Sequence, residues 1–309
     1  MSADDDLHPQ VRSVLRASFG AAPTPADLEA YRASYLQTSL ELGGAAAPVA
    51  AVEDVVIPRG DGGSIAARAY RPLVPADPLG AIVWCHGGGW IAGDLDSFDH
   101  VVRELANASG AVCVSVDYRL APEHPFPAGV EDARAAVAWA IGHGSEQLGF
   151  DGARVCVGGD SAGGALAASA ALHERRRVRA QLLVYPALDA RMASPSYAEF
   201  ADDAVLPAVT MAECWAAYLD GHDPDDPEAS PLAGDVGGAP AAYVAVAAHD
   251  VLRDDGLAYA QALREAGVEA ETEVFAGMVH GFLRFGGVVD AAHEAIGAIG
   301  DAARSAIAP

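Results

Sequence analysis

Three residues that follow strand-like segments of this chain could together attack a substrate carbonyl carbon. They are a serine, an aspartate and a histidine. Ser161 stands in the pattern Gly-Asp-Ser-Ala-Gly, which follows the apolar run 153–158 and opens an alanine-rich run. Small residues two positions before and after a serine allow a sharp strand-to-helix turn that lifts the hydroxyl out of the sheet. Chance alone would give about 0.2 such matches in a chain of this composition. The pattern therefore predicts a nucleophile only if partners exist elsewhere.

Chain order predicts the base and the carboxylate that orients it. Asp250 follows the apolar segment 241–246, and His280 follows the segment 270–275. Open α/β sheets bind ligands at the carboxyl ends of their strands, and hydrolases with this turn place the acid and then the histidine after the serine. We therefore predict that Ser161, Asp250 and His280 form a catalytic triad.

Nearby polar residues offer alternatives to these assignments. Asp189 follows a strand but comes too early in the chain, while Asp254 and Asp255 suit the first turn of a helix. His249 directly precedes the predicted acid, so its ring could not easily turn toward the serine. Asp160, beside the nucleophile, is expected to be structural, since no step of acyl transfer requires a second carboxylate there.

A glycine triplet predicts the site of the negatively charged intermediate. The run His86-Gly-Gly-Gly-Trp90 directly follows the apolar segment 81–85, and chance would give about 0.01 such matches. Successive glycines expose backbone N–H groups, which suit the oxyanion of acyl transfer. A phosphate site is the competing use, but no Gly-Lys-Ser/Thr follows and the chain has no lysine. We predict an oxyanion hole from the N–H groups of Gly88, Gly89 and Ala162, and a structural role for His86.

Alternating segments must position these residues. Strand-like and helix-like runs alternate after residue 80, which predicts a mostly parallel sheet with helices on both faces. A hairpin of segments 52–58 and 65–71 precedes them. The further predicted strands are 81–85, 111–116, 153–157, 181–184, 241–246 and 270–275, and the predicted helices are 101–108, 130–141, 162–175, 254–266 and 291–307.

Two segments lie outside this alternation. Two helices are predicted at 8–18 and 25–42, the second with Thr24 as its N-cap, and about 55 residues separate strands 181–184 and 241–246. We predict a single domain spanning 1–309, with a helical cap built from about 1–45 and 187–235 that covers the site. The alternative is a peripheral insertion without a role at the site.

Charge and composition narrow the class of partner. The net charge is −24, and all 19 basic residues are arginine, which argues against nucleic acid and anionic membranes. No run of about 18 uncharged apolar residues predicts a membrane span, and the acidic start shows no secretory signal, so we expect a cytoplasmic protein acting on a small molecule. The four cysteines form no CxxC pair, and the three that lie in apolar strand-like runs are expected to be small buried hydrophobes. We expect no metal and no cofactor.

Five motifs together resemble the signatures of hormone-sensitive-lipase-like (bacterial family IV) esterases. They are His86–Trp90, Tyr118–Pro127, Gly159–Gly164, Asp250–Asp254 and His280–Phe282, in the family's order. The resemblance implies an α/β-hydrolase fold of about eight strands with a helical cap, and hydrolysis of carboxylic esters without a cofactor. It also makes a homodimer a candidate assembly. One departure is Val251, where the family usually has proline after the aspartate.

These observations predict two-step acyl transfer to Ser161 from short- to medium-chain carboxylic esters. An amidase, a lactonase or a carbamate hydrolase would use the same triad, so the motifs do not separate them. A ligand receptor on a hydrolase scaffold is a further alternative, although such proteins tend to lose a member of the triad. The proline-stiffened segment Tyr118–Pro127 is expected to support the glycine triplet and the serine turn.

Overall fold

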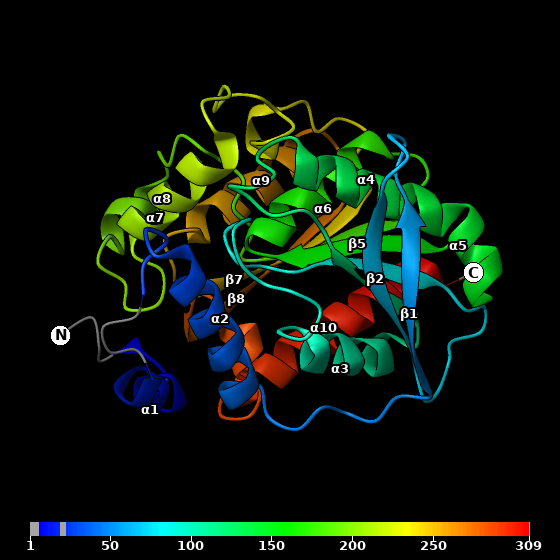
Figure 1. Ribbon diagram of the computed structural model, residues 1–309, viewed down its shortest axis with the longest axis horizontal. Helices are drawn as coiled ribbons and strands as arrows, with labels where there is room; N and C mark the ends of the chain where they lie inside the picture. The colour runs from blue at the N-terminus through cyan, green and yellow to red at the C-terminus, as the bar shows by residue number, and fades with distance from the viewer. Residues whose placement is uncertain (1–5, 19–22, 309) are drawn as a thin grey trace.

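An eight-stranded sheet runs through the centre of the protein in the computed structural model, which describes residues 6–18 and 23–308 (Figure 1). The strand order is β1-β2-β4-β3-β5-β6-β7-β8. The pairs β1–β2 and β2–β4 are antiparallel and the remaining pairs are parallel, so the predicted fold class is confirmed. The strands are β1 (Ala51–Pro58), β2 (Ser64–Arg71), β3 (Ala81–Cys85), β4 (Val112–Asp117), β5 (Val155–Asp160), β6 (Ala180–Val184), β7 (Ala241–His249) and β8 (Ala270–Val279).

Burial explains why the central strands read as continuous apolar runs. Every residue of β3, β5 and β6 is buried, because helices cover both faces of the sheet. In the outer hairpin, β1 and β2 each carry exposed positions, and buried and exposed residues alternate only in the second half of β1 and the first half of β2. Its turn is held by Asp61, whose carboxylate accepts a hydrogen bond of 2.9 Å from the N–H of Gly63. The predicted hairpin is therefore confirmed.

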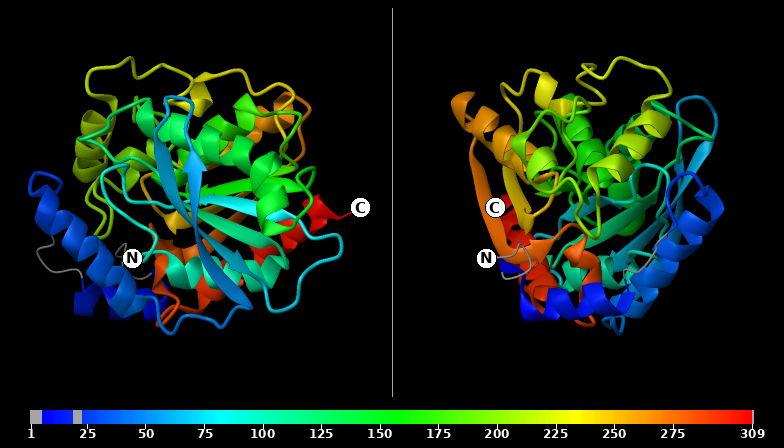
Figure 2. Two further views of the ribbon diagram at one scale, coloured as in Figure 1. Left: turned by 45° about the vertical axis from the view of Figure 1, so that its right-hand side comes forward. Right: turned by 90° about the vertical axis from the view of Figure 1, so that its left-hand side faces the viewer.

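Two apolar layers enclose the sheet. Figures 1 and 2 show α3 and α10 on one face and α4, α6 and α9 on the other, and a separate cluster of buried side chains lies under each group. The helices of these layers are α3 (Asp99–Ser109), α4 (Ala128–Ile141), α6 (Ala162–His173), α9 (Arg253–Glu265) and α10 (Asp290–Ile307). All four cysteines are buried and unpaired, which confirms the prediction for the three in strand-like runs.

Some predicted boundaries were wrong for local reasons. Helix α2 (Leu28–Leu42) begins three residues later than expected, because Asp27 rather than Thr24 is its N-cap and accepts a hydrogen bond from the N–H of Ala30. Strand β5 starts at Val155 instead of 153, since a turn around Asp151 occupies the preceding residues. The short helices α5 (His143–Leu148) and α7 (Pro195–Glu199) were not predicted.

The segments outside the alternation gather at one side of the molecule. Figures 1 and 2 place α2 and the segment 187–235 on the same side. The latter contains α7, α8 (Ala208–Leu219) and the short helix η2 (Pro231–Ala233), and α1 (Pro9–Ser18) lies beside β8. Residues 1–5 and 19–22 of the predicted cap lie outside the described residues. Residues of both α2 and α8 line the cavity that contains Ser161.

The apolar layer under β3 gives a test of the fold. Ile82 is fully buried, and Ile82→Ala should lower the free energy of unfolding by about 2–5 kcal/mol, because it leaves a cavity between β3 and the helices beneath it. Denaturant unfolding measures this loss. The matched control is Val56→Ala on β1, where the side chain is 66% exposed and a change below about 0.5 kcal/mol is expected. Equal effects of the two substitutions would contradict the described packing.

Candidate active site

The turn between β5 and α6 presents Ser161 to the cavity. Ser161 has φ 54° and ψ −121°, a strained conformation for a residue other than glycine. Its N–H donates to the carbonyl oxygen of Val184 at 2.9 Å, which anchors the turn to β6. A Cβ at Gly163 would overlap the carbonyl oxygen of Cys85, and a Cβ at Gly159 would overlap that of Gly163. Glycine is therefore required on both sides of the serine.

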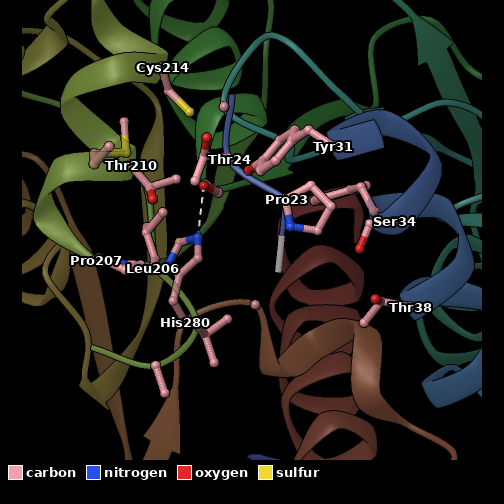
Figure 3. Close-up of a pocket in the computed structure, with 18 of the residues that line it drawn as sticks. Pro23, Thr24, Tyr31, Ser34, Thr38, Leu206, Pro207, Thr210, Cys214 and His280 are labelled. Carbon is pink, nitrogen blue, oxygen red and sulfur yellow. Dashed lines mark hydrogen bonds between the residues drawn. The ribbon is translucent and has the colours of Figure 1, made fainter. Parts of the chain in front are cut away.

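His280 joins the serine to an aspartate. Its Nε2 lies 2.9 Å from Ser161 Oγ, the interaction that the dashed line from His280 marks in Figure 3. Its Nδ1 lies 2.7 Å from Asp250 Oδ2. A carboxylate only accepts hydrogen bonds, so Nδ1 donates to Asp250 and Nε2 is left to accept from the serine hydroxyl. Asp250 is fully buried, and its other oxygen accepts from the N–H of Leu252 at 2.9 Å. The three residues of the predicted triad are thus in direct contact.

The glycine triplet forms a loop beside Ser161. Gly88 has φ 128° and Gly89 has φ 63°, so both positions need glycine. Both residues line the same cavity as Ser161. Within the described ranges, the N–H groups of Gly88, Gly89 and Ala162 donate no hydrogen bond to the protein. These donors are therefore available to a bound oxyanion.

Buried polar groups fix this loop. Asp160 Oδ1 accepts from the N–H of Gly87 at 2.9 Å, and the Tyr118 hydroxyl donates to the carbonyl oxygen of His86 at 2.8 Å. The rings of Tyr118 and His86 stack with centroids 4.4 Å apart. Both His86 and Asp160 thus hold the backbone, in agreement with the structural roles expected for them.

Arg32 links α2 to the loops behind the glycine triplet. Its Nε donates to the carbonyl oxygen of Ile91 at 2.6 Å and its Nη2 to that of Ala121 at 3.1 Å. Its two Nη groups also pair with the Glu123 carboxylate, each at 2.7 Å. The segment Tyr118–Pro127 therefore supports the triplet, as expected, and α2 is tied to both.

The alternative residues lie in other surroundings. Asp189 pairs with the Arg191 guanidinium, with its Oδ1 2.8 Å from Nε. Asp255 accepts from the Ser194 hydroxyl at 2.5 Å. The His249 ring packs edge-on against Phe200. None of these three contacts the Ser161 hydroxyl.

Ser161 and His280 open into a cavity of about 330 Å³. Tyr31, Ser34 and Thr38 of α2 line one side, and Leu206, Pro207 and Cys214 line the opposite side (Figure 3). Arg284, four residues after His280, also lines it. These residues were not among the predicted site residues, although the spacing 31, 34, 38 on one helix was a usable signal.

Burial sets the charge state of two groups at the site. It lowers the pKa of His86 to about 4, so this imidazole is neutral at physiological pH. Burial also raises the pKa of Asp160 to about 7, against the opposing effects of Arg284 and the Gly87 N–H. No group of three or more His, Cys, Asp or Glu side chains in the described part of the chain could hold a metal ion.

Comparison with known proteins adds the family. Residues 82–284, more than half of the chain, match the family described as alpha/beta hydrolase fold. The chain belongs to this family. The expected relationship to hormone-sensitive-lipase-like esterases is confirmed, and the named relatives are esterases.

In the described residues, no helix is long and apolar enough to cross a membrane.

The similarity extends over most of the chain. This chain is 43% identical over 242 residues to carboxylesterase NlhH of Mycobacterium tuberculosis, and the match covers 75% of this chain and 76% of the relative. It is 35% identical over 274 residues to ethyl acetate hydrolase of Pseudomonas putida, covering 86% of each chain. The solved structure of a hyperthermophilic esterase from the archaeon Pyrobaculum calidifontis superposes with a TM-score of 0.90 at 38% identity, covering 98% of this chain and 99% of that one.

The raised pKa of Asp160 predicts a pH-dependent stability. Because its pKa is about 7 in the folded protein and ordinarily 3.8, the folded state binds more protons between these values, and stability falls as pH rises. Asp160→Asn keeps an acceptor for Gly87 but cannot ionise. We expect the wild type to lose roughly 2 kcal/mol more free energy of unfolding between pH 5 and pH 8 than this variant.

Denaturant unfolding at the two pH values measures that difference. Asp301→Asn is the matched control, because this side chain is 75% exposed and forms only a surface ion pair with Arg304. It should keep the pH dependence of the wild type. An unchanged pH dependence in Asp160→Asn would contradict the assigned pKa.

Proposed function

We propose that Ser161, Asp250 and His280 are the catalytic triad of a serine carboxylesterase, with Gly88, Gly89 and Ala162 as its oxyanion hole. The chain is a carboxylic ester hydrolase of the alpha/beta hydrolase family. The observation that carries the proposal is the double contact of His280, 2.9 Å from Ser161 Oγ and 2.7 Å from Asp250 Oδ2. The unpaired N–H groups beside the serine support it.

In the first half-reaction, Ser161 Oγ attacks the ester carbonyl carbon while His280 Nε2 takes its proton. The carbonyl oxygen becomes an oxyanion and accepts hydrogen bonds from the backbone donors, each worth about 3 kcal/mol. When the intermediate collapses, the carbon–oxygen bond to the alcohol breaks, and His280 gives its proton to the departing alcohol oxygen. An acyl-enzyme on Ser161 remains.

In the second half-reaction, water attacks the acyl carbon and gives a proton to His280, and Ser161 leaves with that proton as the acid is released. Asp250 accepts the Nδ1 hydrogen bond throughout, which keeps Nε2 directed at the serine and stabilises the imidazolium. Its complete burial strengthens this interaction.

An amidase, a lactonase or a carbamate hydrolase would use the same steps. The names of the relatives favour esters, since NlhH is a carboxylesterase and a Pseudomonas putida relative hydrolyses ethyl acetate. A matched ester and amide of one acid would separate these activities. The receptor alternative gains no support, because the serine, histidine and aspartate are all present and in contact.

The cap belongs to the same proposal. We assign one domain to 1–309, with a cap from about 1–45 and 187–235, because the described parts of both segments line the cavity. A homodimer, which rests on the family resemblance, and a cytoplasmic location stay predictions.

Removal of the nucleophile tests the mechanism. Ser161→Ala should lower kcat for p-nitrophenyl butyrate by about 10⁴-fold or more, because no other group can form the acyl-enzyme. A fluorophosphonate probe should label the wild type and not this variant. Ser305→Ala on α10, whose hydroxyl bonds only to the Asp301 carbonyl oxygen, is the control and should keep full activity. Wild-type turnover by Ser161→Ala would refute the triad.

The cavity volume predicts the acyl length. At about 330 Å³ it lies at the lower end of the range for small-molecule sites, so short and medium acyl chains fit. Along a p-nitrophenyl series from acetate to palmitate, kcat/KM should peak at or below about eight carbons and fall at least roughly tenfold at palmitate. Highest activity on long-chain emulsions would be incompatible with this cavity.

A further inference from the structure

The wall of the cavity formed by α2 is built from hydroxyl side chains. Tyr31, Ser34, Tyr35 and Thr38 follow the spacing of one helix face, and all four line the cavity. Figure 3 shows Tyr31, Ser34 and Thr38 along one side. This side can therefore donate and accept hydrogen bonds along its length.

The opposite wall is mostly apolar, with Thr210 as its hydroxyl side chain. Val205, Leu206, Pro207 and Met211 line it, and Leu206 and Met211 are buried. The acyl part and the alcohol part of a bound ester would thus contact walls of different polarity. A purely aliphatic ester would leave the hydroxyl wall without partners.

A buried arginine stands at the polar side. Arg284 is 6% exposed and is the only buried arginine among the described residues. Its Nη1 donates to the buried Ser39 hydroxyl at 2.8 Å, and its guanidinium carbon lies 4.0 Å from the centre of the Tyr35 ring. The side chain is therefore held in one place by α2.

Arg284 has no carboxylate partner in the described part of the chain. By contrast, Arg32, Arg68 and Arg119 each form ion pairs with acidic side chains. Asp160 also lines the cavity, but it forms no ion pair with Arg284, and its Oδ1 serves the Gly87 N–H. Because no carboxylate forms an ion pair with this buried cation in the described residues, a bound anion would be favoured there.

The unused edge of the guanidinium has the geometry for a carboxylate. With Nη1 bonded to Ser39, Nε and Nη2 make no hydrogen bond to the described protein, and these two groups form the side edge that pairs with both oxygens of a carboxylate. Gly281 lies beside this edge, where an added Cβ would come within 3.4 Å of Nη2. Glycine at this position keeps the edge open.

We propose that Arg284 binds a carboxylate of the substrate, so that the preferred substrates are half-esters of dicarboxylic acids. The inference rests on the proposed esterase function. The ester carbonyl lies at Ser161, and the free carboxylate at the far end of the acyl chain pairs with Nε and Nη2 of Arg284. Attack, release of the alcohol and hydrolysis proceed as described above, because Arg284 takes no part in proton transfer.

Half-esters and their neutral amides provide the test. Monoethyl succinate, glutarate and adipate are each compared with the ester in which the free carboxylate is replaced by a carboxamide of the same size. The wild type should favour the carboxylate by about tenfold or more in kcat/KM, with a maximum at one chain length that reports the distance to Arg284. Buffer of at least about 0.15 M salt screens the acidic surface.

Arg284→Met should abolish this preference through a higher KM for the half-esters. The loss in kcat/KM for the half-esters should exceed the loss for p-nitrophenyl butyrate by about tenfold or more, and Arg284→Lys should keep part of the preference. Arg103→Met is the matched control, since Arg103 also lies over a tyrosine ring, that of Tyr70, but pairs with Asp99 outside the cavity. It should behave as the wild type.

Three outcomes would overturn the proposal. An equal loss for half-esters, amides and p-nitrophenyl butyrate in Arg284→Met would assign the residue to holding α2 alone. An unchanged preference would exclude contact with the carboxylate. A stronger preference of the wild type for a neutral hydroxyl-bearing ester, such as glyceryl monobutyrate, would assign the polar wall to alcohols. Failure of the esterase function itself would appear separately, as loss of p-nitrophenyl butyrate hydrolysis by the wild type.

Discussion

The site depends on one contact, in which His280 bridges Ser161 and Asp250. These residues are far apart in the sequence, so the contact exists only because β5, β7 and β8 end at the same edge of one parallel sheet. A shift of one residue in strand pairing would exchange the two faces of a strand, so the packing that sets the register also sets the site. The register between β7 and β8 is irregular near His249, directly before the aspartate, and such irregularities redirect the chain at the end of a strand.

Strain at this edge is balanced by buried hydrogen bonds. Ser161, Gly88 and Gly89 adopt backbone conformations with positive φ, which the surroundings must hold at Ser161. Asp160, Tyr118 and Arg32 restrain the loop through hydrogen bonds to the backbone of the triplet and of the residues on either side of it. Because Arg32 belongs to α2, the same helix that lines the cavity also fixes the loop that offers the oxyanion donors. Substrate contacts and catalytic geometry are therefore mechanically linked.

The sheet and the proposed triad could be predicted because their signals are local. Apolar runs mark the strands, and chemically distinctive residues follow them at Ser161, Asp250 and His280. The start of α2 was wrong because propensity favoured Thr24 and Pro25, whereas the carboxylate of Asp27 caps the helix. The cavity walls could not be predicted in the same way. Which face of α2 turns toward the serine is set by long-range packing, and its hydroxyl face shows no apolar periodicity.

Charge acts at two ranges in this protein. The net charge of −24 is spread over the surface, and salt screens such charges beyond about 8 Å at physiological ionic strength. Around the buried groups at the site, the nearest charges dominate, because the local dielectric constant is lower than that of bulk water. Burial raises the pKa of Asp160 to about 7, so this carboxyl is only partly ionised near neutral pH and compensates Arg284 incompletely. The polarity of the cavity thus follows from α2 and Arg284 rather than from overall composition.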